Sequence, residues 1–179
     1  SIASGKASAV VWFTGLSGAG KTTLAEAARG ELAAKGHSVM LLDGDGLRPV
    51  LSAGLGFGRA DVLENNTRVA RHCAQHRREA DILLVPIISP YVEGRAAARA
   101  IRAPGFFLVH VRADLETVMG RDPKGLYRRA QAGEIPDMIG YSPDTPYEPP
   151  VDADLTIDTA SLSPQSAVDR LVCYIAASL

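Results

Sequence analysis

The chain has 179 residues, of which 46% are hydrophobic, so it can build one domain with a full core but not two ordinary domains. Its formal net charge of -1 provides no general attraction for polyanions, so neither nucleic acid nor an acidic membrane surface is an expected partner. No apolar run is long enough to cross a bilayer, and residues 1–6 lack the apolar segment of a signal peptide. We therefore expect a cytoplasmic protein with a flexible tail over residues 1–8 and a single domain over residues 9–179. Its cysteines, Cys73 and Cys173, lack metal-ligand spacing and are expected to be buried free thiols.

The first predicted elements surround a glycine-rich sequence. Residues 10–13 are β-branched and aromatic, which is typical of a strand, and residues 22–35 repeat apolar side chains at helical spacing. Between them, residues 15–22 read Gly-Leu-Ser-Gly-Ala-Gly-Lys-Thr and fit the phosphate-loop pattern G-x-x-x-x-G-K-[ST]. Glycines let successive N–H groups approach one anion, and the helix N-terminus adds partial positive charge.

This pattern predicts a site for a nucleoside triphosphate, with ATP as the expected ligand. The residues expected to bind it are Gly15, Ser17, Gly18, Ala19, Gly20, Lys21, Thr22 and Thr23. Lys21 can reach the β- and γ-phosphates, and the Thr22 hydroxyl can ligate Mg²⁺. The alternative, a glycine-rich turn with an incidental lysine, leaves the flanking strand and helix unexplained.

Two carboxylates follow the second predicted strand, residues 38–42. Asp43 and Asp45 come at the end where a parallel strand delivers residues to a ligand. If strand geometry continues through them they share a face, and one could orient metal-bound water while the other accepts the proton of an acceptor hydroxyl. An Asp-Gly turn is the alternative interpretation.

The rest of the chain alternates helical and extended patterns. Helices are expected over residues 47–51, 60–78, 93–102, 114–119 and 164–177. Strands are expected over residues 82–88, 106–111 and 155–157. The segment of residues 120–150 is rich in Gly, Pro, Asp and Tyr, with only residues 126–131 helical, and it is predicted to be an active-site lid. The alternation predicts a three-layer α/β fold of the P-loop kinase type with a mainly parallel five-stranded sheet.

Several motifs follow one another along the chain: residues 15–22, Leu42-Asp43-Gly44-Asp45 with Arg48, Leu55-Gly56-Phe57, Glu64-Asn65, Ile88-Ser89-Pro90-Tyr91, residues 122–127 and Pro146-Tyr147-Glu148. Together, in this order and at nearly its spacings, they resemble the adenylylsulfate kinase family. The resemblance covers residues 10–158. It implies a homodimeric enzyme that uses ATP and Mg²⁺ to phosphorylate the ribose 3′-hydroxyl of a small-molecule nucleotide, adenosine 5′-phosphosulfate.

The resemblance also implies residue roles. Asp45 would be the catalytic base, Asp43 its partner near the metal, and Lys124 a lid residue that reaches the transferring phosphate. Arg121 would help to hold the ATP base. The residues implied for acceptor binding are Asp45, Arg48, Phe57, Asn65, Ile88, Ser89, Lys124, Gly125 and Met138. In some members the serine at the Ser89 position is a phosphorylation site; a serine that starts a turn is the alternative.

The departures from the family pattern fall mainly on the acceptor side. Val62 stands where the family has an arginine that holds the phosphosulfate, and Met138 stands where a second aromatic ring would sandwich the base against Phe57. Val92 replaces the arginine that follows Ser-Pro-Tyr, and residues 141–145 carry a short insertion. The phosphate loop is unaltered.

Three functions therefore stay open at this point. The chain could be a divergent adenylylsulfate kinase whose acceptor clamp is rebuilt, for example by Arg59 or Arg95. It could instead be a related kinase that phosphorylates a ribose hydroxyl of another nucleotide, such as cytidine diphosphoramidate. The third reading is an inactive nucleotide-binding regulatory subunit, and the complete phosphate loop counts against it.

Overall fold

The computed structural model describes residues 8–179, with the exception of the side chains of residues 44–46. The strands are β1 (Ala9–Thr14), β2 (Val39–Leu41), β3 (Ile82–Val85), β4 (Phe106–Arg112) and β5 (Leu155–Asp158). The helices are α1 (Lys21–Ala34), α2 (Gly44–Leu51), α3 (Arg59–Gln75), α4 (Val92–Arg102), α5 (Leu115–Arg121), α6 (Leu126–Gln131) and α7 (Pro164–Ser178).

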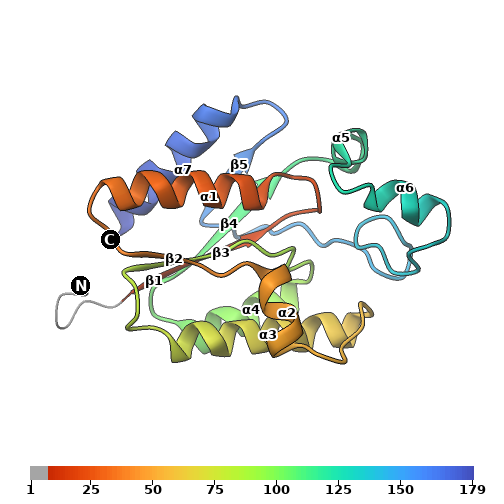
Figure 1. The fold of residues 1–179 in the computed structure, drawn as a ribbon, viewed down its shortest axis with the longest axis horizontal. Helices are drawn as coiled ribbons and strands as arrows, with labels where there is room; N and C mark the ends of the chain where they lie inside the picture. Colours follow the sequence, from red (N-terminus) through yellow and green to blue (C-terminus); the bar gives the residue numbers. More distant parts are fainter. Residues whose placement is uncertain (1–7) are drawn as a thin grey trace.

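The strands form one parallel sheet in the order β2-β3-β1-β4-β5. β1 lies in the centre, where Val10 pairs with Leu83 of β3 and Phe106 of β4, and all of its residues are buried. Helices α1 and α7 cover one face and α3 and α4 cover the other, as Figure 1 shows. This arrangement confirms the predicted three-layer α/β fold.

The alternation of side chains along β1 connects both layers to the sheet. Val11 and Phe13 belong to the core under α1 and α7, whereas Val10 and Trp12 belong to the core under α3 and α4. Complete burial of a large apolar side chain stabilises the fold by about 1.5–3 kcal/mol. The central strand therefore holds the loop that follows it, Gly15 onward, at a rigid edge.

Most predicted elements occur within a few residues of their expected bounds, and α6 matches residues 126–131. β3 is shorter than predicted: it ends at Val85, because Pro86 has no N–H to donate to a ladder. The expectation that strand geometry continues through Asp43 and Asp45 was wrong. β2 ends at Leu41, and α2 begins at Gly44, so Asp43 lies in the connection and Asp45 in the helix.

Two further expectations concern the chain termini and the cysteines. Cys73 is buried in the core, but Cys173 on α7 is exposed, so the expectation of two buried thiols was wrong. The predicted tail lies outside the described residues apart from Ser8, which is buried and accepts hydrogen bonds from Arg102. None of the described helices has the length and apolar content to span a membrane.

Candidate active site

The phosphate loop connects β1 to α1 at the carboxyl edge of the sheet, on the right in Figure 1. Gly15 starts the loop against β4: a Cβ at this position would lie 2.4 Å from the carbonyl oxygen of Val111. Gly20 ends the loop as the N-cap of α1, with a φ of 99° that L side chains rarely adopt. The first turn of a helix leaves its N–H groups without partners inside the helix, so this turn can bind an anion.

Three carbonyl groups of the loop accept hydrogen bonds from side chains in distant parts of the chain. Tyr127 Oη of α6 donates to Ser17 O at 2.7 Å, and Thr159 Oγ1, just after β5, donates to Ala19 O at 2.7 Å. Arg121 of α5 donates to Gly18 O at 3.2 Å and to Thr159 O at 2.9 Å. These contacts give the carbonyl groups of residues 17–19 partners outside the loop. Thr159 carries no local sequence signal for this role.

Lys21 is buried at the start of α1. Its Nζ donates to the carbonyl oxygens of Gly15 and Leu16, both at 2.8 Å, so the ammonium group lies against the first two residues of the loop. Thr22 and Thr23, the next helical residues, are exposed. Asp43 is also exposed, after β2 at the same edge of the sheet. The side chain of Asp45 lies outside the described part of the structure, and its predicted role as base is untested.

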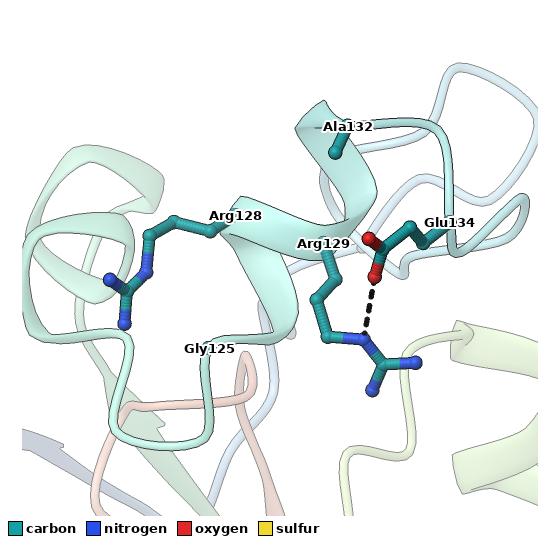
Figure 2. Close-up of a pocket in the computed structure, with 5 residues that line it drawn as sticks. All are labelled: Gly125, Arg128, Arg129, Ala132 and Glu134. Carbon is teal, nitrogen blue, oxygen red and sulfur yellow. Dashed lines mark hydrogen bonds and ion pairs between the residues drawn. The ribbon is translucent and has the colours of Figure 1, made fainter.

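The predicted lid begins with a structured turn between α5 and α6. Asp122 is buried with φ 31°, and its carboxylate accepts hydrogen bonds from the N–H groups of Tyr127 and Arg128 at 3.1 and 3.2 Å. This turn places Lys124 on the surface and Gly125 at the N-cap of α6. A shallow hollow of about 360 Å³ beside the helix is lined by Gly125, Arg128, Arg129, Ala132 and Glu134, as Figure 2 shows.

Three of the predicted acceptor residues lie together where α2 meets α3. Arg48 donates to the carbonyl oxygens of Leu55 and Gly56, at 3.1 and 2.6 Å, and its guanidinium lies 4.1 Å from the centroid of the Phe57 ring. Phe57 is half exposed, at 52%, so its free surface can receive a flat ligand. Asn65 accepts a hydrogen bond from Ser52, which connects the two helices.

Ser89 is buried rather than open to a ligand. Its hydroxyl accepts a hydrogen bond from Trp12 Nε1 at 2.9 Å, and its backbone has a φ of 45°. The carbonyl oxygen of the preceding residue, Ile88, accepts from Gly15 N at 3.1 Å. The connection after β3 is thus joined to the start of the phosphate loop. Acceptor binding or phosphorylation at Ser89 stays a prediction, and either through the hydroxyl would compete with Trp12.

Met138 and Phe57 are not brought together. Met138 is 6% exposed and packs in the core under α1 and α7. The loop of residues 139–145, which contains the short insertion, folds back over it: Thr145 Oγ1 donates to Met138 O at 3.2 Å, and Thr145 N to Ser142 O at 3.1 Å. Val62 is likewise buried, against Tyr91 and Ile139. A base sandwich between Phe57 and Met138 would therefore require the loop to move.

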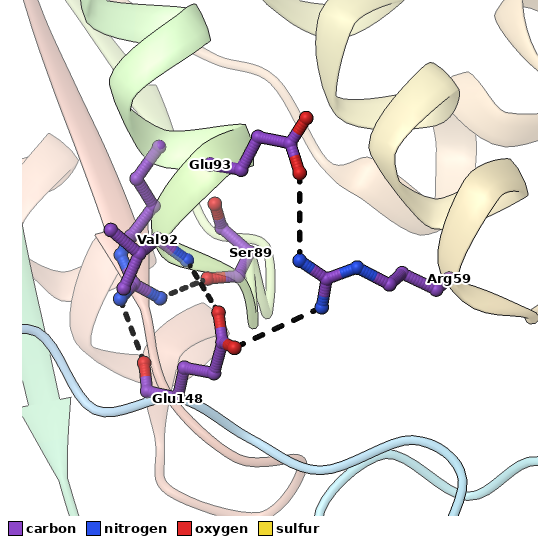
Figure 3. A network of polar contacts seen from close by, with 6 residues as sticks. Arg59, Ser89, Val92, Glu93 and Glu148 are labelled. Atoms are coloured by element: carbon purple, nitrogen blue, oxygen red, sulfur yellow. Dashed lines mark hydrogen bonds and ion pairs between the residues drawn. The ribbon is translucent and has the colours of Figure 1, made fainter.

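The two arginines considered for a rebuilt clamp have different surroundings. Arg95 is buried and donates to the carbonyl oxygens of Ser89 and Glu148, at 2.8 and 2.7 Å. Arg59 is half exposed and lies 4.3 Å from the centroid of the Tyr91 ring. It pairs with Glu93 at 3.5 Å and with Glu148 at 3.8 Å, and Figure 3 shows both ion pairs. Of the two, only Arg59 presents its guanidinium to solvent.

A second hollow, of about 640 Å³, lies between the carboxyl ends of β4 and β5 and the segment of residues 146–150. His110 of β4 lines it, with its ring stacked against that of Tyr147 at a centroid distance of 6.2 Å. Burial, together with the charges of Arg112 and Arg95, lowers the pKa of His110 to about 4. The imidazole is therefore neutral at pH 7, and it adds no charge to this side of the site.

This protein is a nucleotide-dependent phosphotransferase of the P-loop kinase class. The features that define the class are the parallel sheet, the phosphate loop after its central strand and the helical segment that packs beside this loop. The family model for adenylylsulphate kinase matches residues 7–158. The chain belongs to the adenylylsulfate kinase family.

Individual relatives agree with this membership. An adenylyl-sulfate kinase of Geotalea uraniireducens is 43% identical over 167 residues, which cover 93% of this chain and 79% of the relative. The structure of the Mycobacterium tuberculosis APS kinase in complex with AMPPNP and APS has a TM-score of 0.86 and 38% identity, over 94% of this chain and 98% of that chain. A hexameric APS kinase from Thiobacillus denitrificans has a TM-score of 0.68 and 31% identity, over 97% of this chain and 30% of that chain.

Proposed function

We propose that this protein transfers the γ-phosphate of ATP to the ribose 3′-hydroxyl of adenosine 5′-phosphosulfate, giving 3′-phosphoadenosine 5′-phosphosulfate and ADP. The observation that carries the proposal is the phosphate loop with its carbonyl groups bound by Arg121, Tyr127 and Thr159. Membership of the family and the likeness to a kinase solved with AMPPNP and APS support the choice of donor and acceptor.

The reaction places few chemical demands on the protein beyond positioning and charge neutralisation. Lys21 would exchange its bonds to the loop carbonyls for bonds to the β- and γ-phosphates. Asp45 would take the proton of the 3′-hydroxyl while the oxygen attacks the γ-phosphorus, and the bond to the leaving ADP oxygen breaks. Lys124 would meet the transferring phosphate once the lid closes over it.

Mg²⁺ fits the residues present at the donor side. This ion usually retains waters and substrate phosphates and takes only one or two protein oxygens, so a cage of protein ligands is not required. The Thr22 hydroxyl and the Asp43 carboxylate are both exposed at the edge of the sheet where the phosphates would lie. Bound there, the ion would neutralise charge on the β- and γ-phosphates.

The acceptor would lie over Phe57, with Arg48 and Asn65 beside it. We assign the contact with its phosphosulfate to Arg59, because Arg95 is buried and its guanidinium already donates to two carbonyl groups. The ion pairs of Arg59 with Glu93 and Glu148 are long and solvent-exposed, and pairs of this kind contribute about 0–1 kcal/mol. Releasing Arg59 toward an anionic ligand would therefore cost little.

One observation favours a different acceptor. Val62 and Met138 are both buried, so neither side chain replaces the arginine and the aromatic ring that the family pattern provides there. A nucleotide with a smaller base to stack, such as cytidine diphosphoramidate, would suit a site without the second aromatic ring. The catalytic residues would act in the same way on its ribose hydroxyl.

A coupled assay of ADP release with MgATP separates these functions. Adenosine 5′-phosphosulfate is compared with nucleoside diphosphates and cytidine nucleotides. Lys21→Ala is the blank, and Lys35→Ala, an exposed lysine at the C-cap of the same helix, is its control. Turnover on the order of 1–100 s⁻¹ with adenosine 5′-phosphosulfate is expected. Turnover with another nucleotide but not with adenosine 5′-phosphosulfate would show that the acceptor is a different nucleotide. Tight ATP binding without turnover on any acceptor would indicate an inactive subunit.

We further propose that the enzyme works in the cytoplasm as a homodimer. The hexameric relative from Thiobacillus denitrificans supports self-association of this chain.

A further inference from the structure

Tyr147 and Glu148, here called the 147–148 strap, fasten the end of the lid segment to the connection after β3. Glu148 N donates to Pro90 O at 2.8 Å, and Val92 N donates to Glu148 Oε1 at 2.9 Å. Arg95 joins Glu148 O to Ser89 O. Figure 3 shows Glu148 beside Ser89 and Val92. The strap is thus fixed to the connection by several bonds and cannot shift alone.

The other half of the strap reaches β1. Thr14, the last residue of β1, is buried, and its Oγ1 lies 2.8 Å from each of three oxygens: Tyr147 Oη, Ile88 O and Ser89 O. A threonine hydroxyl has one proton, and the two carbonyl groups can only accept. The Thr14 proton therefore goes to a carbonyl group, so Tyr147 Oη is the donor to Thr14 Oγ1. The protonated phenol is stable in this role, because burial raises the pKa of Tyr147.

These bonds meet at a strained point. Ser89 has a φ of 45°, and a non-glycine residue in that region costs on the order of 1–3 kcal/mol unless its surroundings hold it there. Its carbonyl oxygen accepts from Thr14 and Arg95, and its hydroxyl accepts from Trp12. Gly15 follows Thr14 directly and donates to Ile88 O. A small displacement of Thr14 would therefore move the start of the phosphate loop relative to Ile88 and Ser89.

We propose that the Tyr147 hydroxyl is a positioning group for phosphoryl transfer: by donating to Thr14 Oγ1, it fixes the start of the phosphate loop relative to the Ile88–Ser89 connection on the acceptor side. Tyr147 acts through Thr14 and contacts neither substrate. This inference rests on the proposed function, since it names the residue that sets the distance between donor and acceptor in that reaction.

The test replaces only the hydroxyl groups. Tyr147→Phe retains the ring against His110 and is expected to lower kcat about tenfold or more, because misplacing reacting groups by about 1 Å can cost a hundredfold. The KM for MgATP and the ATP Kd should stay within about twofold, since the phosphate loop itself is intact. Tyr141→Phe, which removes a more exposed hydroxyl from the same segment, is the control and should have the parent kcat.

Two variants of Thr14 separate positioning from a general loss of stability. Thr14→Ser retains the hydroxyl and should have a far smaller defect than Thr14→Val. Thr14→Val removes the bond to Tyr147 and also the bond that Thr14 donates to a carbonyl group, so its defect should be at least as large as that of Tyr147→Phe. The double variant Tyr147→Phe with Thr14→Val should lose no more than Thr14→Val alone, because that variant already removes the bond to Tyr147. A kcat for Tyr147→Phe within about twofold of the parent, or additive losses in the double variant, would overturn the proposal.

The assay first records turnover of the parent with adenosine 5′-phosphosulfate. If the parent does not phosphorylate this acceptor, the proposed function is wrong. The positioning role of Tyr147 is then tested by NMR instead. Trp12, the single tryptophan of the chain, donates its indole N–H to Ser89, so its resonance reports on the connection. Tyr147→Phe should shift this resonance while Tyr141→Phe leaves it in place; an unmoved resonance would overturn the positioning role.

Discussion

Arg59 and Arg95 both contact Glu148 beside the proposed acceptor site, but they differ in burial. Burial lowers the pKa of Arg95, whose guanidinium donates to two carbonyl groups and so holds the backbone of Ser89 and Glu148 together. Arg59 is half exposed and held by weak ion pairs. A guanidinium group that must bind a ligand is better supplied by a half-exposed residue such as Arg59, because breaking its weak ion pairs costs little free energy.

Arg59→Ala should therefore raise the KM for the acceptor about tenfold, since a hydrogen bond to a charged group contributes about 1.5–3 kcal/mol and each 1.4 kcal/mol is tenfold. The KM for MgATP should not change. Arg71→Ala, an exposed arginine on the same helix, provides the matched control in steady-state kinetics. An acceptor KM equal to that of the parent would remove Arg59 from the acceptor site.

His110 makes stability depend on pH in a predictable direction. Its folded-state pKa of about 4 is below the ordinary value of 6.5, so the unfolded chain binds the proton more tightly. The stabilisation is complete above the unfolded pKa and is lost as the pH falls from 6.5 toward 4. His110→Gln should remove this component, and the difference in unfolding free energy between parent and variant should change by on the order of 1 kcal/mol across the window, a value reduced for solvent screening. Parallel pH profiles from chemical denaturation would contradict it.

Among the elements, α5, α6 and the connection after β5 each bind one carbonyl group of the phosphate loop. The loop is consequently supported from the side of the lid as well as by β1 and α1. Among the described side chains of α6, Tyr127 is the one that hydrogen-bonds to the phosphate loop. A shift of α6 would therefore change the conformation of the loop through this bond. ATP affinity should respond when that contact is removed.

Tyr127→Phe should weaken ATP binding about fivefold, which corresponds to the loss of one hydrogen bond of about 1 kcal/mol. Tyr174→Phe on α7, far along the chain from the loop, is the control, and calorimetric titration with MgATP measures both. Equal ATP affinity of Tyr127→Phe and the parent would show that the lid helix does not shape the loop.

The local sequence pattern predicted helices and strands well where one feature, such as helical periodicity or a β-branched run, is strong. The bounds of α6 and the buried strand β1 follow from periodicity and residue type. The turn after β2 did not, because Asp and Gly suit both a strand end and the start of a helix.

The contacts that hold the site together could not be predicted from local pattern at all. Thr14 meets Tyr147 across 133 positions, and Thr159 meets Ala19 across 140. No periodicity relates residues that far apart, and Met138 was placed with Phe57 because nothing in the sequence shows that the following loop covers it.

Across the whole molecule, the proposed donor and acceptor residues occupy different parts of the sheet edge. The phosphate loop and its three anchoring side chains follow β1, β4 and β5, whereas the proposed acceptor residues Arg48 and Ile88 follow β2 and β3. Thr14, at the end of β1, contacts both Tyr147 and Ile88, so it connects the two groups.

The proposed homodimer is also a property of the whole molecule. Light scattering during size-exclusion chromatography should give a mass twice the 18.9 kDa of one chain, independent of MgATP. A mass of one chain at micromolar concentration would contradict the homodimer, and a mass of six chains would match the hexameric relative instead.

The central claim, that the γ-phosphate of ATP moves to the ribose 3′-hydroxyl of adenosine 5′-phosphosulfate, is tested most directly by ³¹P NMR of the reaction mixture. The account predicts a new phosphomonoester resonance coupled to the ribose H3′, growing in step with ADP and absent with Lys21→Ala. Retention of the full adenosine 5′-phosphosulfate signal with no new phosphomonoester, while the parent binds MgATP, would contradict it.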